Sequence, residues 1–280
     1  MSEEADPLLV RRFSVKRVDD AHSQRILDHV ANEEPLEMRI SYWFKDARIS
    51  ESLAVTMRTP GHDRELTAGF LLSEGVIRTR QDIFELRSLG ADPSNEIVAE
   101  LSKNVDFEAW RLTRSSVVNS SCGICGKRTR EAIATQLPPP TNGNLRVHRS
   151  LITRLPELLR ARQKGFAKTG GLHAAALVNH AGAVEAVFED IGRHNALDKL
   201  IGHCVLNDRI PLENHLLFLS SRSSFELVQK AIMAGASILA TVGGPSSLAI
   251  EAAREHSLTL IGFIRDGHFN IYSGEWRIDS

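Results

Sequence analysis

The stretch "HLLFLSSRSSFELVQKAIMAGASILATVGG" (residues 215–244) predicts a strand, a helix and a second strand in succession. Its two ends, residues 215–221 and 237–244, are short and largely apolar, whereas the segment between them repeats apolar residues at helical spacing. Short apolar runs are typical of parallel strands covered on both faces, and a helix is the usual connection between two such strands. The stretch therefore predicts an α/β fold built on a parallel sheet.

The same alternation continues on either side of this stretch. Upstream, residues 171–178 and 183–190 have the pattern of an antiparallel hairpin. Helices are expected at 150–168, 193–206 and 246–257, and a last strand is expected at 258–264. The first helix is expected to be capped by Ser150, and Pro156 would either kink it or mark its true first turn. A helix, two antiparallel strands and three helix–strand units is the order of the cytidine-deaminase-like fold. We therefore predict that residues 141–280 form a cytidine-deaminase-like three-layer domain with a mixed sheet.

The first half of the chain has a different pattern. A hairpin is expected from residues 36–44 and 51–59, a helix over 63–77, and a further pair of strands at 82–90 and 95–102. The stretch "PPPTNGN" (138–144) has the composition of a linker. We predict a smaller β-rich α+β domain over residues 36–140, which ends in a cysteine-containing loop and the linker. Residues 1–35 are polar and are predicted to form a flexible N-terminal tail.

The composition is that of a globular protein without a strong overall charge. The 280 residues are 42% hydrophobic and 25% charged, and the formal net charge is −1. A charge this close to zero provides no global field that would recruit nucleic acid or an anionic membrane surface. The N-terminus has no apolar segment behind a basic start, and no apolar run reaches the ~18 residues that a membrane span needs. We therefore expect a cytoplasmic protein with neither a nucleic acid nor a membrane as partner.

Three strand–helix junctions are rich in small and polar residues, at 188–196, 219–226 and 241–249. In an open α/β sheet, ligands bind beyond the carboxyl ends of the strands, where helix N-termini offer N–H donors. Arg193, Arg222 and Arg265 add cations, so the junctions are consistent with a site for a phosphate-bearing small molecule. Ordinary helix capping by the same serines and glycines is the alternative. The sequence contains neither a G-x-G-x-x-G dinucleotide motif nor a nucleoside-triphosphatase loop.

The zinc chemistry of a cytidine deaminase is not expected. It requires H-x-E at the start of the second helix and P-C-x-x-C at the start of the third. Here the second helix begins "RHNA" at Arg193, and the third follows "SRSS" at Ser221. Both thiolates and the glutamate that acts as general acid and base are missing, so no water would be activated by zinc.

Cys122 and Cys125 form a C-x-x-C pair in "NSSCGICGKR" (119–128). A structural zinc site would need a second ligand pair at close spacing, and a redox dithiol usually lies at the start of a helix after a strand. This pair is instead flanked by serines and glycines, and the region from 109 to 130 contains five basic residues and no acidic one. A positive field favours the thiolate form, so a reactive thiolate on a tether is the third possibility. The remaining cysteine, Cys204, lies in an amphipathic helical pattern and is predicted to be packing material.

Six segments of the chain together resemble the FdhD family, the formate dehydrogenase accessory sulfurtransferases. They are "LTAGFLLSEGVI" (66–77), "SSCGICGK" (120–127), "TGGLHAAAL" (169–177), "FEDIGRHNALDKLIG" (188–202), "SSRSSFELVQKA" (220–231) and "GFIRDGHFNIYS" (262–273). The resemblance extends over about residues 35–273.

This resemblance implies a cytoplasmic homodimer that accepts sulfur from a cysteine desulfurase as a cysteine persulfide. The sulfur would pass to the molybdenum or tungsten bis(molybdopterin guanine dinucleotide) cofactor, which formate dehydrogenase needs in sulfurated form. Cys122 would carry the persulfide, with Cys125 as its partner. The loop after the last strand would bind the cofactor near its guanine dinucleotide, and it comprises Phe263, Ile264, Arg265, Asp266, Gly267 and His268. Family members usually have arginine where His268 stands.

Two alternatives to sulfur transfer remain open at this point. The chain would be a non-catalytic chaperone if it bound the cofactor without moving sulfur, and the C-x-x-C pair would belong to a zinc or redox module if it held a metal or exchanged a disulfide. The sequence also leaves open which cysteine first receives sulfur and which residues form the dimer.

Overall fold

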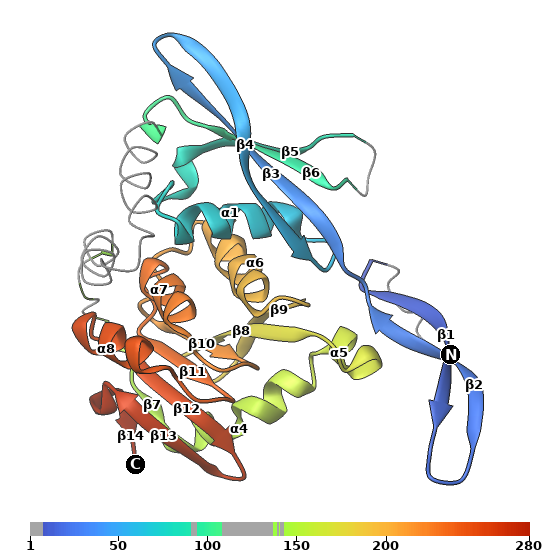
Figure 1. The fold of residues 1–280 in the computed structure, drawn as a ribbon. Coiled ribbons are helices and arrows are strands. Elements are labelled where there is room, and N and C mark those ends of the chain that lie inside the picture. The colour runs from blue at the N-terminus through green and yellow to red at the C-terminus, as the bar shows by residue number, and fades with distance from the viewer. Residues whose placement is uncertain (1–7, 91–93, 108–136, 139, 141–142) are drawn as a thin grey trace, which may run out of the picture.

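The computed structural model describes residues 8–90, 94–107, 137–138, 140 and 143–280. Within them, the main sheet has six strands in the order β13-β12-β11-β10-β8-β9 (Figure 1). These strands are β8 (His173–Asn179), β9 (Val184–Asp190), β10 (His215–Leu219), β11 (Ile238–Thr241), β12 (Thr259–Arg265) and β13 (His268–Ser273). β10, β11 and β12 are parallel, whereas β8, β9 and β13 pair antiparallel with their neighbours. The predicted α/β fold with a mixed sheet is therefore confirmed, and its assignment as cytidine-deaminase-like stays a prediction.

Helices cover both faces of this sheet. One hydrophobic cluster joins the sheet to α6 (Arg193–Leu206), α7 (Phe225–Met233) and α8 (Ser247–Glu255). A second cluster joins the opposite face to α4 (Arg149–Arg160), through Ile152, Leu155 and Leu159. Near-continuous apolar strands such as β10 are explained by this arrangement, because both faces of the strand are buried.

The helix predicted over 150–168 is two helices, α4 and α5 (Lys164–Thr169). The cap of α4 is His148 rather than Ser150, since the His148 side chain accepts a hydrogen bond from the Ser150 N–H. Pro156 lies inside α4 without ending it. The break follows instead from a tertiary contact, in which the Glu189 carboxylate of β9 accepts the N–H groups of Gly165 and Phe166 at 2.8 Å. Local sequence does not encode such a contact.

The first half of the chain forms a four-stranded sheet with the order β4-β3-β6-β5. Its strands are β3 (Glu34–Phe44), β4 (Ala47–Arg58), β5 (Ile83–Ser88) and β6 (Glu96–Leu101), and the short helix η1 (Arg80–Asp82) precedes β5. Helix α1 (Asp63–Ser73) lies between this sheet and α6 (Figure 1). The predicted hairpins and helix are confirmed here. Two further short strands, β7 (Val147–His148) and β14 (Ile278–Asp279), pair in parallel. β14 follows the short helix η2 (Glu275–Arg277), and its pairing with β7 places it at the start of α4.

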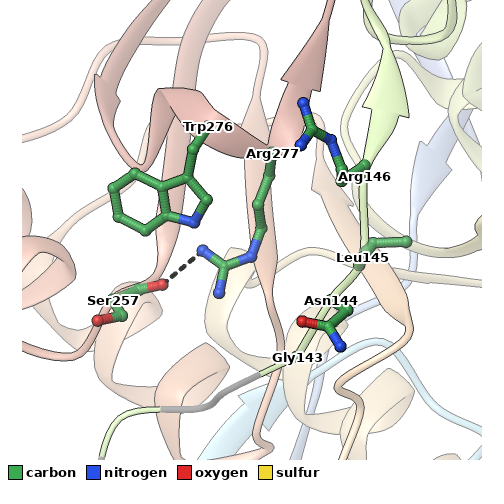
Figure 2. A pocket seen from close by; sticks show the side chains of 7 residues that line it. All are labelled: Gly143, Asn144, Leu145, Arg146, Ser257, Trp276 and Arg277. Atoms are coloured by element: carbon green, nitrogen blue, oxygen red, sulfur yellow. Dashed lines mark hydrogen bonds between the residues drawn. The ribbon is translucent and has the colours of Figure 1, made fainter.

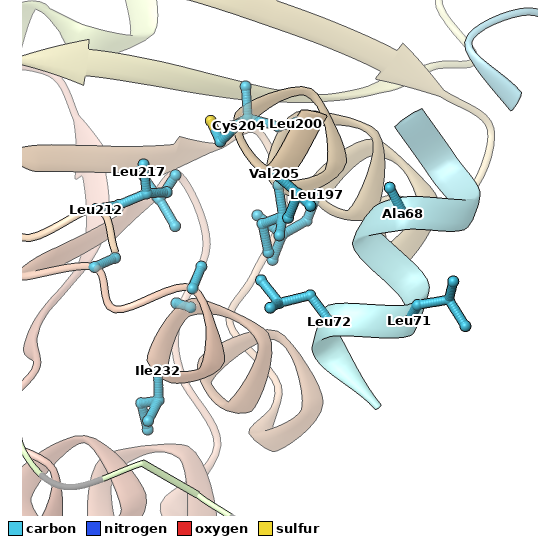
Figure 3. Close-up of a cluster of buried hydrophobic side chains, with 14 of the residues drawn as sticks. Ala68, Leu71, Leu72, Leu197, Leu200, Cys204, Val205, Leu212, Leu217 and Ile232 are labelled. Atoms are coloured by element: carbon cyan, nitrogen blue, oxygen red, sulfur yellow. The ribbon is translucent and has the colours of Figure 1, made fainter. Parts of the chain in front are cut away.

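The two halves share one hydrophobic core. Ala68, Leu71 and Leu72 of α1 belong to the same buried cluster as Leu197 and Leu200 of α6 (Figure 3). The two helices approach so closely that a Cβ at Gly202 would lie 1.7 Å from the Glu65 carbonyl oxygen, and a Cβ at Gly69 would lie 1.9 Å from the Asp198 carbonyl oxygen. This glycine contact fixes the first half of the chain against the main sheet. Whether residues 36–140 form a separate domain stays a prediction.

The predicted flexible tail over residues 1–35 is wrong for much of its length. Strands β1 (Val10–Val18) and β2 (Ser23–Ala31) form an antiparallel hairpin that extends from the body of the molecule near α5 (Figure 1). Asp19 forms the turn, because its Oδ1 accepts the N–H groups of Ala21 and His22. Most side chains of both strands are exposed, so the hairpin lacks the buried apolar face that makes a strand visible in sequence. None of the helices in the described part of the chain is long and apolar enough to cross a membrane.

Candidate functional site at the carboxyl edge of the sheet

The predicted polar junctions meet at one edge of the main sheet. His173 at the start of β8 pairs with Asp190 at the end of β9, and Ser220 after β10 donates its N–H to the Ala174 carbonyl. Ser223 after β10 bridges to Pro245 after β11, and Phe263 of β12 donates its N–H to the Gly243 carbonyl. The ends of β9, β10, β11 and β12 are thus connected side by side. We refer to this region as the carboxyl edge.

A buried polar network connects the carboxyl edge to the first half of the chain. The Asp190 carboxylate and the Lys199 ammonium are both buried and lie 2.7 Å apart. Asp190 also accepts the N–H groups of Thr59 and Gly192, while Lys199 donates to the Thr59 carbonyl at 2.7 Å. Asn195 bridges the Met57 carbonyl and Asp190. The acidic and amide side chains of this junction therefore position the start of α6, and they are not available to a ligand.

The cations that remain at the carboxyl edge are arginine side chains. Arg222 and Arg265 are exposed, and Arg193 is half-buried with its Nε buried and without a hydrogen-bond partner among the described residues. Neither α6 nor α7 has a side-chain cap, whereas Ser246 caps α8 through the Ala249 N–H. The Oγ of Ser224, at the start of α7, is buried and has no described partner. Uncapped helix N-termini beside arginines provide N–H donors and positive charge, which is the chemistry that binds phosphate.

His173 and His194 stand at the same edge. Burial and the positive charge of Arg193 lower the pKa of His173, and the Asp190 carboxylate opposes this shift. Burial also lowers the pKa of His194, against the opposite effect of Glu226, whose Oε2 lies 2.9 Å from the imidazole Nε2. Both imidazoles are therefore favoured in their neutral form, which adds no positive charge to the site at neutral pH.

We expect the imidazole of His173 to titrate below its ordinary pKa of 6.5. Because the folded pKa is lower than the unfolded one, the stability that neutral His173 contributes is present above pH 6.5 and is lost as the pH falls from there toward the folded pKa. Proton NMR of the imidazole measures the midpoint directly. The Arg193→Gln variant should raise it, since a like charge is removed, and a wild-type midpoint at or above 6.5 would contradict the prediction.

The predicted cofactor segment is not a loop after the last strand. Phe263, Ile264 and Arg265 belong to β12, Asp266 and Gly267 form a turn, and His268 begins β13, a strand that the sequence did not predict. A short strand at the sheet edge without a fully buried side chain gives only a weak apolar pattern. Within the segment, Ile264 is buried in the core under α4, so its side chain cannot contact a ligand.

The exposed part of this segment faces the glycines that follow β11. A Cβ at Gly244 would lie 2.5 Å from the Phe263 ring, so the ring packs directly on the glycine backbone. The Arg265 guanidinium lies 5.8 Å from the centre of the same ring. Phe263 has a φ of 54°, a strained value for a bulky residue, and the strand register shifts between Gly262 and Arg265. The bulge presents the Phe263 ring and the Arg265 guanidinium at the carboxyl edge.

Of the three cysteines, the described part of the structure contains Cys204 alone. Cys122 and Cys125 lie outside the described residues. Cys204 is fully buried in the core beside Leu200 and Val205, and burial raises the pKa of its thiol to about 12. Its role as packing material is confirmed, because a thiol in this setting does not ionise at neutral pH.

Comparison with known proteins places the chain in a family. The model of the FdhD/NarQ family matches residues 31–279. The chain belongs to the FdhD/NarQ family. Among FdhD relatives named as sulfur carrier proteins, those from Streptomyces coelicolor and Saccharolobus solfataricus are 41% and 40% identical to it. Each comparison covers 96% of this chain, and 96% and 98% of the relatives, respectively.

A solved structure has the same fold. It is a crystal structure described as a candidate formate dehydrogenase accessory protein from Desulfotalea psychrophila, with a TM-score of 0.73 and 21% sequence identity. The match covers 96% of this chain and 99% of the other. The family model and the relatives confirm the expected family, and the crystal structure shows the same fold.

Sequence reasoning missed the residues that hold the carboxyl edge in place. Thr59 was identified only as the end of a hairpin, and Lys199 only as part of a helix. Their partner Asp190 comes more than a hundred positions after Thr59, and no local pattern connects them. The one available signal was weak: Lys199 is directly followed by Leu200 and Ile201 within the predicted helix, and a charge among apolar residues requires a partner if it is buried.

Proposed function

We propose that this FdhD/NarQ member is a sulfurtransferase that carries sulfur on Cys122. A cysteine desulfurase would supply the sulfur as a persulfide, whose sulfur–sulfur bond breaks as the Cys122 thiolate takes the outer sulfur and the donor leaves as a thiolate. The names of the relatives, sulfur carrier proteins, support this role. The basic sequence around the C-x-x-C pair also supports it, because a positive field stabilises the attacking thiolate.

The substrate that receives the sulfur would be the molybdenum bis(molybdopterin guanine dinucleotide) cofactor, bound at the carboxyl edge. The observation that carries this assignment is the meeting of two uncapped helix N-termini with Arg193, Arg222 and Arg265 at one edge. Such an arrangement suits the phosphates of a guanine dinucleotide. The exposed Phe263 ring offers a surface on which a planar base could stack. A cytidine-deaminase-like topology, which stays a prediction, would together with the missing zinc ligands be consistent with a nucleotide site that has lost deamination.

Release of the sulfur needs two electrons, and Cys125 would supply them. Its thiolate attacks the inner sulfur of the Cys122 persulfide, so that a Cys122–Cys125 disulfide forms and hydrosulfide leaves. The hydrosulfide already has the oxidation state of a sulfide ligand. We further propose that the chain works in the cytoplasm as a homodimer and that a formate dehydrogenase is the recipient of the sulfurated cofactor.

The test is intact-mass analysis after incubation with a cysteine desulfurase and cysteine. We expect a gain of one sulfur atom that a reductant removes, in the wild type and in Cys125→Ala, and no gain in Cys122→Ala. A variant of the core thiol, Cys204→Ala, serves as control and should gain sulfur normally. Sulfur loading that persists in Cys122→Ala would assign the carrier to another residue, and a wild type without loading would refute the proposal.

A further inference from the structure

Two features of the described residues are not used by the proposed sulfur transfer. One is a cavity of about 490 Å³ beside Arg277, at the segment before β7 (Figure 2). The Arg277 guanidinium is buried without an ion pair to a described residue. The exposed Trp276 ring lies on its Ser257 side, away from the Nε–Nη2 edge, so no one ligand would contact both. The other feature is the hairpin of β1 and β2, residues 10–31, which we call the arm.

One face of the arm carries a row of apolar side chains. In the antiparallel register Val15 lies opposite Ile26, and Phe13 and Val30 lie on the same face in neighbouring rows. We call these four side chains the apolar row. Phe13 is 51% exposed. A two-stranded hairpin on its own is at best marginally stable in water, so the arm needs a surface that covers this row.

Contacts at the base of the arm set its direction. The buried Asn32 donates its N–H to the Leu9 carbonyl at 2.9 Å, and its Nδ2 donates to the Leu8 carbonyl at 3.3 Å. The same Nδ2 lies 3.2 Å from a carboxylate oxygen of Glu34, and α5 contacts the base of β2. The arm therefore extends away from the four-stranded sheet of its own chain (Figure 1). Its apolar row is left for another molecule to cover.

The four-stranded sheet carries a matching surface on the face away from α1, whose core contacts lie on the other face. On this outer face Met57 of β4 lies opposite Pro35 of β3, and Val55 lies opposite Glu37. Val55 is 66% exposed, and Pro35 and Met57 are exposed as well. Glu96 of β6 lies beside Glu37 in the same row. We call these five side chains the sheet patch.

The charges of the two surfaces are opposite. Arg11, Arg17 and Asp28 share the face of the apolar row, so this face has one net positive charge. In the sheet patch the side-chain nitrogens of Arg39 lie 3.0 Å and 3.7 Å from the carboxylates of Glu37 and Glu96, so these three groups together have one net negative charge. The arm as a whole contains five basic and three acidic residues, so two arms packed on each other would repel.

We propose that the arm lays its apolar row on the sheet patch of a second copy of this chain. This inference rests on the homodimer of the proposed function and adds the residues that form its interface. In a twofold dimer each copy provides an arm and receives one. A two-stranded face about 30 Å long and about 10 Å wide, buried on both partners at two such contacts, amounts to about 1,200 Å², which reaches the lower limit of a stable interface. A different partner that covered a single arm would bury half of that area.

Sedimentation equilibrium of the full chain tests this interface. We expect a wild-type dimer whose dissociation constant rises at least about a hundredfold in Phe13→Asp and in Val55→Asp, because each change places a carboxylate in an apolar contact twice per dimer. Val55→Asp leaves the arm unchanged, so it decides even if Phe13→Asp loosens the hairpin. The matched control is Leu27→Asp, since Leu27 is 68% exposed on the opposite face of the arm, and this variant should dimerise as the wild type does.

The possible outcomes separate the interface from the proposed function. A dimer that tolerates both Phe13→Asp and Val55→Asp would overturn the interface alone. A monomeric wild type would overturn the interface and the homodimer together. The sulfur-carrier role depends on neither result, because intact-mass analysis measures the loading of Cys122 directly.

Cross-linking identifies which surfaces meet. In a Cys122→Ala/Cys125→Ala background, Phe13→Cys and Val55→Cys chains are mixed, with one of them labelled with nitrogen-15, and are treated with a short bismaleimide after the subunits have exchanged. Cys204 is buried and should not react. We expect the main product to join one chain of each kind. Absence of this mixed product, or a main product that joins two Phe13→Cys chains, would refute the contact between the arm and the sheet patch.

Discussion

Cys122→Ala is expected to abolish the activity of the dependent formate dehydrogenase in cells, while the variant protein accumulates at its normal level. The physical reason is that alanine has no sulfur that could take part in exchange, so no other interaction can compensate for the loss. The measurement is formate oxidation in extracts of cells in which this chain replaces the resident family member. Under the proposed function the effect should be complete, because without transferred sulfur the recipient enzyme would receive an inactive cofactor.

This experiment distinguishes the sulfur-carrier hypothesis from the hypothesis of a chaperone that only binds the cofactor. A chaperone that shields the cofactor depends on the carboxyl edge and not on the thiol, so Cys122→Ala would remain active and Arg265→Ala would not. The carrier requires both. Cys204→Ala is the matched control, since it removes a cysteine that is buried and has a thiol pKa of about 12. Full activity of Cys122→Ala would eliminate the sulfurtransferase proposal.

Much of the fold was predictable because its strands and helices bury continuous or periodic apolar faces. β10 and α7 illustrate this, since one is covered on both sides and the other buries Leu227, Val228 and Ala231 toward the sheet. The hairpin β1–β2 and strand β13 were missed for the opposite reason, because most side chains of the hairpin are exposed and none in β13 is fully buried. Exposed strands are held by backbone pairing, and backbone pairing has no residue pattern of its own.

The sequence predicted where the candidate site lies, but not which side chains contact one another there. Parallel strands place their carboxyl ends at the same sheet edge, so the polar junctions were expected to lie together. The arginines belong to these junctions or lie next to them, so they were expected at the same edge. The roles of individual side chains depended on distant partners. Asp190 and Asn195 were grouped with ligand-binding residues, yet they bind Lys199, Thr59 and Met57. Arg277 is the reverse case, since its neighbours along the sequence give no sign that its charge is buried without a partner.

Among the glycines of the described residues, Gly202 is the one at which substitution by alanine is expected to be most destabilising. The added methyl carbon would lie 1.7 Å from the Glu65 carbonyl oxygen, so α1 and α6 must separate. Alanine favours the helix by at most ~1 kcal/mol over glycine. Separation of the helices disturbs the core that both halves of the chain share, and we expect a net loss of about 3–5 kcal/mol in the free energy of unfolding. Urea denaturation followed by circular dichroism measures it.

Further variants test whether the close contact between α1 and α6 causes the loss of stability. Gly69→Ala places its methyl carbon 1.9 Å from the Asp198 carbonyl oxygen, on the facing helix, and it should destabilise by a similar amount. The double variant should cost less than the sum of the two, because helices already pushed apart by one methyl group accommodate the second. Gly171→Ala is the control, since its methyl carbon would meet nothing closer than 3.6 Å and stability should change by less than ~1 kcal/mol. Wild-type stability of Gly202→Ala would show that the two helices do not need this close contact, and the two halves of the chain would then be held together by the Asp190–Lys199 network instead.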